Sequence, residues 1–471
     1  MLCHIAGLAI VLAASAVVAA GNTDPIDIGS RLELFTDDHL IDVARGAEIR
    51  LNHPLPRETA MTFDAPWEGD TCAYVTVFKD GDLYRMYYRG SNETPKPAHP
   101  MVTCVAQSTD GISWTRPKLG IIEFDGSKDN NIVWMGAGAD TFTPFKDSNP
   151  SVIGAERYKA LAVMRPGGDK TKKAVLFALI SEDGLHWKLM REEPVITDGA
   201  FDSQNLAFWD AERGEYVCYF RDFKNGVRMI KRATSKDFRK WSAGQDVTYI
   251  GAPAEHLYTN AIVPYFRSPG LYLGFPKRFM PDRKVVPEHK VAGVSDGVFM
   301  SSRDGLNFHL YNEAFIRPGR DRENWTDRNI MTAWGLFELK PGEISLYYSE
   351  HYRHPTNRLV RATIRTDGFC SLHAGGDRGE VVTKPLVFSG GELVINYATS
   401  AAGGIRIEVQ DAGGRPIAGF GMDDCQVIYG DDVERVVKWN SGSSVSALAG
   451  KPIRLAFEML DADLYSIKFR P

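Results

Sequence analysis

Short runs of alternating apolar and polar residues dominate this chain, and most of them come in pairs joined by a tight turn. In "YVTVFKDGDLYRMYYRG" (Tyr74–Gly90), two alternating runs flank Asp80-Gly81, and this dipeptide is a strong signal for a β-hairpin. Four other segments follow the same plan: Asn149–Met164, Leu206–Phe223, Ala261–Pro276 and Trp334–Tyr352. Because no long amphipathic helix interrupts the pattern, the sequence predicts an all-β protein.

A second pattern recurs between these hairpins. "STDGISW" begins at Ser108, "SEDGLHW" at Ser181 and "SKDFRKW" at Ser235, while "SSRDGLNF" contains Ser302 and "RTDGFC" is a weaker copy. Ser and Asp side chains bind the backbone of a turn and glycine allows a positive φ, so we interpret the repeat as structural. Hairpins and turns that recur in this way are typical of a propeller, and we predict a five-bladed β-propeller over residues 27–375.

The pattern changes near Glu380. From there the chain consists of short alternating runs separated by Gly-rich turns, as in "IRIEVQDAGGRPIAGF". This arrangement predicts a β-sandwich domain over residues 380–471.

The first twenty residues, "MLCHIAGLAIVLAASAVVAA", contain an apolar run from Ile5 to Val18 that ends in small residues. This predicts a signal peptide over residues 1–20, and an N-terminal membrane anchor is the alternative. No later stretch approaches the roughly 20 apolar residues that a membrane span needs. We therefore expect a secreted or periplasmic protein with no membrane span in the mature chain.

Composition excludes some classes of partner. The chain has 471 residues and a net charge of -5, which gives no reason to expect binding to nucleic acid or to an anionic membrane. The sequence contains no C-x-x-C motif, so cysteine spacing does not suggest a zinc site. We expect no cofactor and no metal ion, and the oligomeric state is left open.

A five-bladed propeller followed by a β-sandwich resembles the glycoside hydrolases of families 32, 43 and 68. The segments "GGELVINYAT" and "LAGKPIRLAFEMLDADLYSIKF" are similar to the C-terminal sandwich of bacterial family 32-like proteins. The resemblance covers nearly the whole mature chain as architecture, and it implies a glycoside hydrolase with a carbohydrate substrate. The family 32 motif Trp-Met-Asn-Asp-Pro-Asn-Gly and the Glu-Cys acid motif are both absent.

Candidate catalytic residues follow from position in the propeller. Residues just before the innermost strand of each blade converge at the mouth of the central channel. Glycosidic cleavage needs one carboxylic acid as proton donor and one carboxylate as nucleophile or base. Each segment before a predicted hairpin carries an acid, and these give four candidates: Glu68 (with Asp70 as its alternative), Asp147, Asp202 and Glu255.

The resemblance bears on two of these acids. Asp147 in "FKDSNP" is similar to the family's Arg-Asp-Pro segment, whose Asp stabilises the transition state, although Lys146 replaces the Arg. Asp202 stands in the third blade, where the family uses Glu. We predict that Asp147 and at least two of the other three acids share one pocket.

Other polar side chains near the predicted channel mouth are candidates for sugar binding. They are His256, Asn260, Arg278, Trp325, Asp327, Arg328, Glu350 and His351. Lys277 and Arg278 would also suit an anionic group. Two alternatives to hydrolysis stay open: a non-catalytic carbohydrate-binding propeller, and a glycoside phosphorylase similar to family 130.

Overall fold

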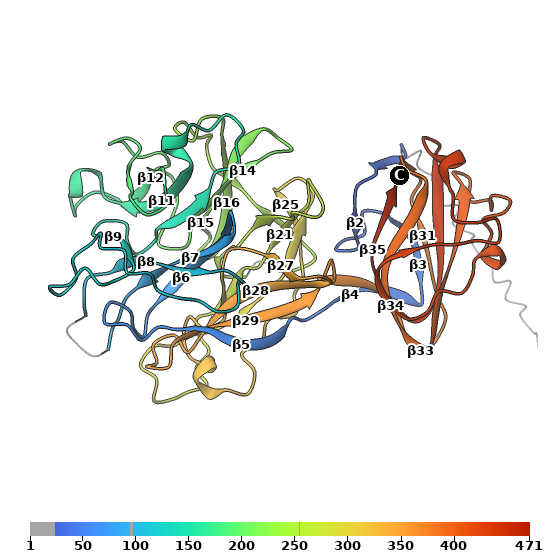
Figure 1. Ribbon diagram of the computed structural model, residues 1–471. Coiled ribbons are helices and arrows are strands. Elements are labelled where there is room, and N and C mark those ends of the chain that lie inside the picture. The colour runs from blue at the N-terminus through green and yellow to red at the C-terminus, as the bar shows by residue number, and fades with distance from the viewer. Residues whose placement is uncertain (1–23, 95–97, 254) are drawn as a thin grey trace, which may run out of the picture.

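The computed structural model describes residues 24–94, 98–253 and 255–471, and this part of the chain is all-β. Figure 1 shows two lobes side by side, a propeller and a sandwich, so the predicted fold class is confirmed. The described residues also form short 3-10 helices: η1 (Gly154–Glu156), η2 (Pro166–Gly168), η3 (Arg322–Trp325), η4 (Met422–Asp424) and η5 (Ser446–Leu448). Within the described ranges, no helix has the length and apolar character needed to span a bilayer. The predicted signal peptide, residues 1–20, lies outside them.

Three units of the propeller are four-stranded sheets of consecutive antiparallel strands. The first contains β6 (Ala73–Asp80), β7 (Leu83–Gly90), β8 (Val102–Ser108) and β9 (Ile132–Met135). The second contains β10 (Thr143–Lys146), β11 (Tyr158–Met164), β12 (Val175–Ser181) and β13 (Lys188–Leu189). The third contains β14 (Leu206–Asp210), β15 (Glu215–Lys224), β16 (Val227–Ser235) and β17 (Gln245–Asp246).

The fourth unit is interrupted at Phe275 and Pro276, because proline cannot donate a ladder hydrogen bond. One of its sheets contains β20 (Val263–Pro264), β21 (Tyr272–Gly274), β24 (Met300–Ser302), β25 (Asn307–Leu310) and β18 (Thr248–Ile250). The other contains β19 (Leu257–Thr259), β22 (Lys277–Met280) and β23 (Val294–Gly297).

The fifth unit joins the two ends of the propeller sequence. It contains β26 (Met331–Thr332), β27 (Phe337–Lys340), β28 (Glu343–Glu350), β29 (Arg358–Arg365) and β5 (Leu55–Thr62). Strand β5 precedes all the other propeller strands in the chain, yet it pairs with β29. This pairing closes the ring, and in Figure 1 the blue β5 runs beside the orange β29.

The hairpin predicted over Asn149–Met164 is built differently. Its first strand is β10 (Thr143–Lys146), which pairs with β11, and the residues between them form the connection. Asp147 therefore follows the inner strand, and Asp140 lies just before it. The end of this strand lines an apolar cavity of about 240 Å³, together with the ends of the other inner strands.

The repeated Ser-x-Asp-Gly turns have a common geometry. In the first, Asp110 Oδ1 accepts hydrogen bonds from the backbone N–H groups of Ile112 and Ser113, both at 2.8 Å, and Ser108 Oγ accepts one from Gly111. In the third, Phe238 takes the glycine position with φ of 62°. The turns are structural, as predicted.

These turns also join neighbouring blades, which the sequence did not indicate. Tyr87 donates its hydroxyl to the carbonyl oxygen of Gly184 at 2.8 Å, from the first unit to the second. Tyr219 donates to the carbonyl oxygen of Gly305 at 2.7 Å, from the third unit to the fourth. These two turns therefore each present a buried acceptor to a tyrosine of the preceding blade.

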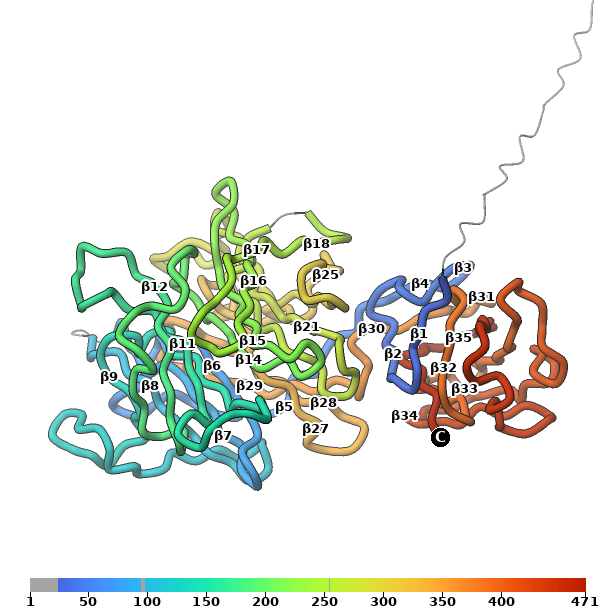
Figure 2. The backbone as a smooth tube through the Cα atoms, turned by 90° about the horizontal axis from the view of Figure 1, so that it is seen from above, coloured from blue at the N-terminus to red at the C-terminus, as the bar shows by residue number. Residues whose placement is uncertain are grey.

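The sandwich lobe takes strands from both ends of the described chain. Its sheet contains β1 (Ile26–Gly29), β2 (Glu33–Leu34), β3 (Ile41–Arg45), β4 (Ala47–Leu51), β30 (Cys370–Ala374), β31 (Gly379–Thr383), β32 (Leu386–Phe388), β33 (Glu392–Asp411), β34 (Asp431–Val436) and β35 (Ile453–Arg470). Figure 2 shows β1 to β4 among the C-terminal strands. This differs from the predicted division, which assigned residues 27–51 and 370–374 to the propeller.

Charged side chains hold the two lobes together. Arg303, in the turn after β24, forms ion pairs with Glu33 at 2.6 Å and with Asp37 at 3.0 Å. Asp367, at the end of the propeller sequence, pairs with Arg267 of the fourth unit at 2.9 Å and accepts a hydrogen bond from Ser466 of β35 at 3.4 Å. Because Glu33 and Asp367 are buried, these pairs fix the N-terminal segment and the last propeller turn against the fourth unit.

Candidate functional site

The inner strands of the propeller meet around a common axis. The backbone N–H of Val77 in β6 donates to the carbonyl oxygen of Trp334 at 2.8 Å, and the Trp334 indole donates to Ile262 at 2.8 Å. The side-chain amide of Gln204 donates to the Val75 carbonyl at 2.9 Å. These contacts join four units, so the residues at the beginning of the inner strands come together at one end of the axis.

A cluster of cations, tyrosines and acids forms at that end, and we name it the hub cluster. Its members are Tyr74, Arg89, Asp140, Asp202, Arg221, Arg228, Tyr258, Lys277, Arg328 and Tyr352.

Tyr258 is the centre of the cationic half of the cluster. Lys277 Nζ lies 4.2 Å from the centroid of its ring, and the guanidinium carbons of Arg221 and Arg228 lie 5.0 Å and 5.5 Å from it. These cations come from strands β22, β15 and β16. An aromatic face attracts cations at such distances, and this reduces the repulsion among the three.

Arg89 extends the cluster to the first unit. Its guanidinium carbon lies 4.8 Å from the centroid of the Tyr74 ring, and Nη2 donates to the Tyr352 hydroxyl at 3.1 Å. Burial and the neighbouring Tyr258 raise the pKa of Tyr74 well above its ordinary value. The phenol of Tyr74 therefore stays neutral in this site.

Two acids face this group. Asp140 precedes β10 and Asp202 precedes β14, so they come from adjacent units. Burial raises the pKa of Asp140 above its ordinary value, the Asp202 carboxylate adds to the shift, and Arg89 opposes it. Asp202 is exposed and makes no hydrogen bond or ion pair with another described residue. The cluster thus holds one acid with a raised pKa and one that is open to solvent.

Arg328 lies at the solvent side of the cluster. Its side chain is 37% exposed, and its backbone has φ of 61°, which is a strained conformation for arginine. Its neighbour Asp327 is buried and contacts His289 Nε2 and Arg353 Nη1, each at 2.8 Å. The Asp327 carboxylate is thus held by two partners other than Arg328.

Three of the four predicted catalytic acids lie in separate ion pairs. Glu68 is buried and accepts hydrogen bonds from Arg116 at 2.7 and 2.8 Å and from the Tyr88 hydroxyl. It is a structural anion of the first unit, because both of its oxygens are paired.

Asp147 is likewise buried, with Lys159 Nζ at 2.6 Å and the Tyr216 hydroxyl at 2.7 Å. Glu255 pairs with Arg278 at 3.0 Å, and the same guanidinium pairs with Asp296 at 2.7 Å. Of the four predicted acids, the structure brings only Asp202 into the hub cluster.

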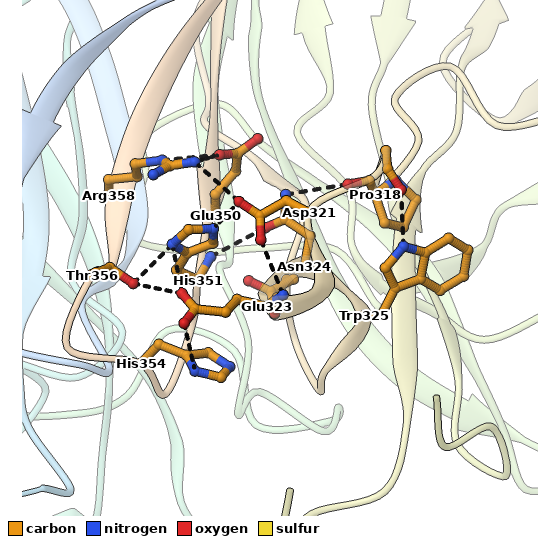
Figure 3. A network of polar contacts seen from close by, with 12 residues as sticks. Pro318, Asp321, Glu323, Asn324, Trp325, Glu350, His351, His354, Thr356 and Arg358 are labelled. Atoms are coloured by element: carbon orange, nitrogen blue, oxygen red, sulfur yellow. Dashed lines mark hydrogen bonds and ion pairs between the residues drawn. The ribbon is translucent and has the colours of Figure 1, made fainter. Parts of the chain in front are cut away.

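The predicted residues Glu350 and His351 belong to a polar network over the fifth unit (Figure 3). Glu350 pairs with Arg358 at 2.7 Å. The His351 ring lies between two acids, with Nε2 2.7 Å from Asp321 and Nδ1 3.0 Å from Glu323. Because these partners occupy both ring nitrogens, His351 orders the loops around η3.

Of the remaining predicted binding residues, one lies at the edge of the hub cluster and two have local structural roles. His256 accepts a hydrogen bond from the backbone N–H of Arg228 at 3.2 Å, so it borders the hub cluster. Asn260 donates to the Tyr219 carbonyl at 3.4 Å, and Trp325 donates to the Gly319 carbonyl at 2.9 Å. These two side chains stabilise the local backbone.

Among the charged residues of the hub cluster, Asp140, Arg89, Arg221 and Arg228 were not predicted from the sequence. A signal was present for two of these cations, because Arg89 and Arg221 follow apolar runs at the end of a second strand, in "YYRG" and "YFRD". Asp140 was missed because the start of β10 was placed too late. Within residues 24–94, 98–253 and 255–471, no group of three or more His, Cys, Asp or Glu side chains is arranged to hold a metal ion.

Comparison with known proteins gives distant similarities of fold. No family model matches the chain, and no curated protein matches it. It is similar to the solved structure of a glycoside hydrolase, with 14% identity, coverage of 67% of this chain and 93% of the other, and a TM-score of 0.47. For a fructofuranosidase from Schwanniomyces occidentalis complexed with fructosylnystose, the identity is 10%, the coverage 94% and 99%, and the TM-score 0.40.

A third similar structure comes from the GH130 family of mannoside phosphorylases, described as containing glycoside hydrolases that target β-1,2 mannosidic linkages in Candida mannan. The identity is 13%, the coverage is 67% of this chain and 94% of the other, and the TM-score is 0.41. At such values the chemistry must be inferred from the side chains of this chain.

Proposed function

We propose that the protein is a glycoside hydrolase and that the reaction takes place at the hub cluster. The observation that carries the proposal is the pair Asp140 and Asp202: two carboxyl groups from adjacent units that interact electrostatically, one with a raised pKa and one open to solvent. Enzymes that cleave glycosidic bonds need such a division between a proton donor and a carboxylate.

In this proposal Asp140 is the general acid. It gives its proton to the glycosidic oxygen as the bond from the anomeric carbon to that oxygen breaks. Asp202, as a carboxylate, either takes a proton from the attacking water or attacks the anomeric carbon itself. The stereochemistry of the first product, followed by NMR, distinguishes inversion from retention.

The proposal is tested by hydrolysis of aryl glycosides and natural oligosaccharides with wild-type protein, Asp140→Asn and Asp202→Asn. We expect cleavage by the wild type and a loss of roughly 10²–10⁴ in rate for Asp140→Asn. Asp423→Asn, in a fully exposed position of the sandwich lobe, is the matched control and should keep full activity. Sugar binding without cleavage of any glycoside would favour the non-catalytic propeller instead.

We also propose that the protein is exported, on the basis of the apolar run from Ile5 to Val18. Expression of the full chain in a bacterial host, followed by cell fractionation and N-terminal sequencing, tests this. The expected product lies outside the cytoplasm and begins close to Gly21. A full-length chain in the cytoplasmic fraction would contradict export.

A further inference from the structure

The hub cluster holds more cations than its acids can neutralise. The basic members are Arg89, Arg221, Arg228, Lys277 and Arg328. Arg221 and Arg328 lower the pKa of Arg228, and Arg328, Arg89 and Arg221 lower that of Lys277. Against them stand two acids, Asp202, which has no ion-pair partner among the described residues, and Asp140, whose pKa is raised by burial. Asp327 is already engaged by His289 and Arg353.

Several donors of this group are also unpaired. Lys277 is fully buried, and its Nζ has no hydrogen-bond partner within the described residues. The Nε atoms of Arg89 and Arg228 are likewise buried and without a described partner. Unpaired buried donors destabilise a protein, so their presence beside an open acid and a partly exposed arginine indicates a site built to receive acceptors from outside.

We propose that Lys277, Arg328 and Arg89 form a subsite for an oxyanion, which is either the carboxylate or sulfate group of an acidic sugar or a free phosphate ion. An oxyanion offers several acceptor oxygens to lysine and arginine donors, and charge-assisted hydrogen bonds of this kind are strong where solvent is excluded. For an acidic sugar the inference rests on the proposed function, because it names the class of glycoside that the same site would accept. With phosphate as the attacking group, the reaction would be phosphorolysis in place of hydrolysis.

Anion binding at this subsite would be linked to proton uptake. Burial lowers the pKa of Lys277 well below its ordinary value, and the facing groups Arg328, Arg89 and Arg221 lower it further, while Asp327 opposes them. The Tyr258 ring covers the amine. A bound oxyanion would raise this pKa again, so anion binding would favour the ammonium form of Lys277 and be accompanied by proton uptake from the buffer.

Isothermal titration calorimetry tests the subsite without any turnover. Wild-type protein is titrated with sodium sulfate, sodium phosphate, galacturonate and, as the neutral control, galactose. Each titration is repeated in two buffers of different ionisation enthalpy. We expect the anions to bind more tightly than galactose, with an apparent enthalpy that depends on the buffer, because a proton is taken up on binding.

The variants Lys277→Met and Arg328→Gln should each weaken anion binding by about tenfold or more, and Lys277→Met should abolish the dependence on buffer. Lys79→Met is the matched control, because Lys79 also lies over a tyrosine ring, 5.7 Å from the centroid of Tyr84, but is exposed and away from the hub. It should bind anions as the wild type does. If Lys277→Met does not fold, as judged by circular dichroism, anion binding by Lys277→Arg and Arg328→Gln tests the subsite instead.

The source of the oxyanion follows from two comparisons. Tighter binding of galacturonate than of sulfate or phosphate, with preferential cleavage of acidic oligosaccharides, indicates a group carried by the sugar. Cleavage that requires added phosphate indicates phosphate as co-substrate. Anion binding that persists in Asp140→Asn supports the subsite even if no glycoside is cleaved. The subsite is disproved if no anion binds, or if binding is unchanged in both Lys277 and Arg328 variants.

Discussion

Lys277 Nζ lies 4.2 Å from the centroid of the Tyr258 ring, fully buried and with no described hydrogen-bond partner. This pair explains how a lysine is accommodated beside Arg221 and Arg228, which contact the same ring. The aromatic face provides the attraction that a carboxylate provides elsewhere in the protein. It leaves the donors of the cluster available to a ligand.

The first prediction concerns this ring. Tyr258→Leu should lower the free energy of unfolding by about 2 kcal/mol or more, because three cations lose their aromatic neighbour. Tyr258→Phe keeps the ring and is the matched control, and it should stay within about 1 kcal/mol of the wild type. Urea unfolding followed by fluorescence measures both. Equal stability of the two variants would show that the ring is not important for holding the cations.

The second prediction concerns the pH dependence of activity. Because Asp140 must be protonated to act as acid and its pKa is raised, the alkaline limb of kcat/KM should lie at higher pH than the ordinary range of an aspartic acid. Arg89 opposes the shift, so Arg89→Met should move this limb to still higher pH. Initial rates over a series of pH values check both statements. A limb that moves to lower pH in Arg89→Met would contradict the assignment.

The third prediction concerns stability and uses the same acid. A carboxyl group whose pKa is raised on folding stabilises the protein below its unfolded-state pKa, and this contribution is lost as the pH rises through the folded-state pKa. Asp140→Asn mimics the protonated form. Its melting temperature should therefore equal that of the wild type in acid and exceed it at neutral pH. Melting curves recorded across this range show whether the difference grows with pH.

The fourth prediction separates a structural acid from a catalytic one. Asp147→Asn removes the carboxylate 2.6 Å from the buried ammonium of Lys159 and leaves it only the more distant Glu156, at 3.6 Å, so it should destabilise the protein by about 3 kcal/mol. The specific activity of the folded variant should stay close to that of the wild type. Asp129→Asn is the control, because Asp129 and Lys118 form an exposed pair that contributes no more than about 1 kcal/mol. A stable but inactive Asp147→Asn would restore this residue to the catalytic group.

The fifth prediction concerns the contacts between blades. Tyr219→Phe leaves the buried carbonyl of Gly305 without its donor and should cost about 1–3 kcal/mol. Tyr429→Phe removes a hydroxyl that is largely exposed, and its stability should be unchanged. Thermal unfolding of the two variants measures the difference.

The architecture was predictable because it depends on local signals. The alternation around Asp80-Gly81 and the Ser-x-Asp-Gly turns indicate strands and tight turns whatever the rest of the chain does. The position of one strand was not predictable in this way. Thr143–Lys146 is short and is followed by a long connection, so the more regular segment after Asn149 was taken for the hairpin.

The candidate site was harder to predict for the same reason. Its residues come from short segments before strands and from single positions at strand ends, and an error of a few residues replaces Asp140 with Asp147. Glu68 and Asp147 stand in sequence contexts that fit catalytic acids. Only their ion-pair partners, Arg116 and Lys159, reveal that they are structural. Those partners lie 48 and 12 residues further along the chain and in no regular register with the acids, so spacing alone does not identify them.

The pairing of β1 to β4 with β30 to β35 has a consequence for how the molecule is made. During synthesis these first strands leave the ribosome long before their partner strands are made. Strand β5 likewise stays unpaired until β29 has been synthesised. Unpaired strand edges invite aggregation, so the nascent chain needs protection over most of its translation. The sandwich lobe contains the first strands that are made, yet it is the last lobe to be completed. A ribosome that stalls before the final strands therefore leaves a propeller without a complete sandwich lobe.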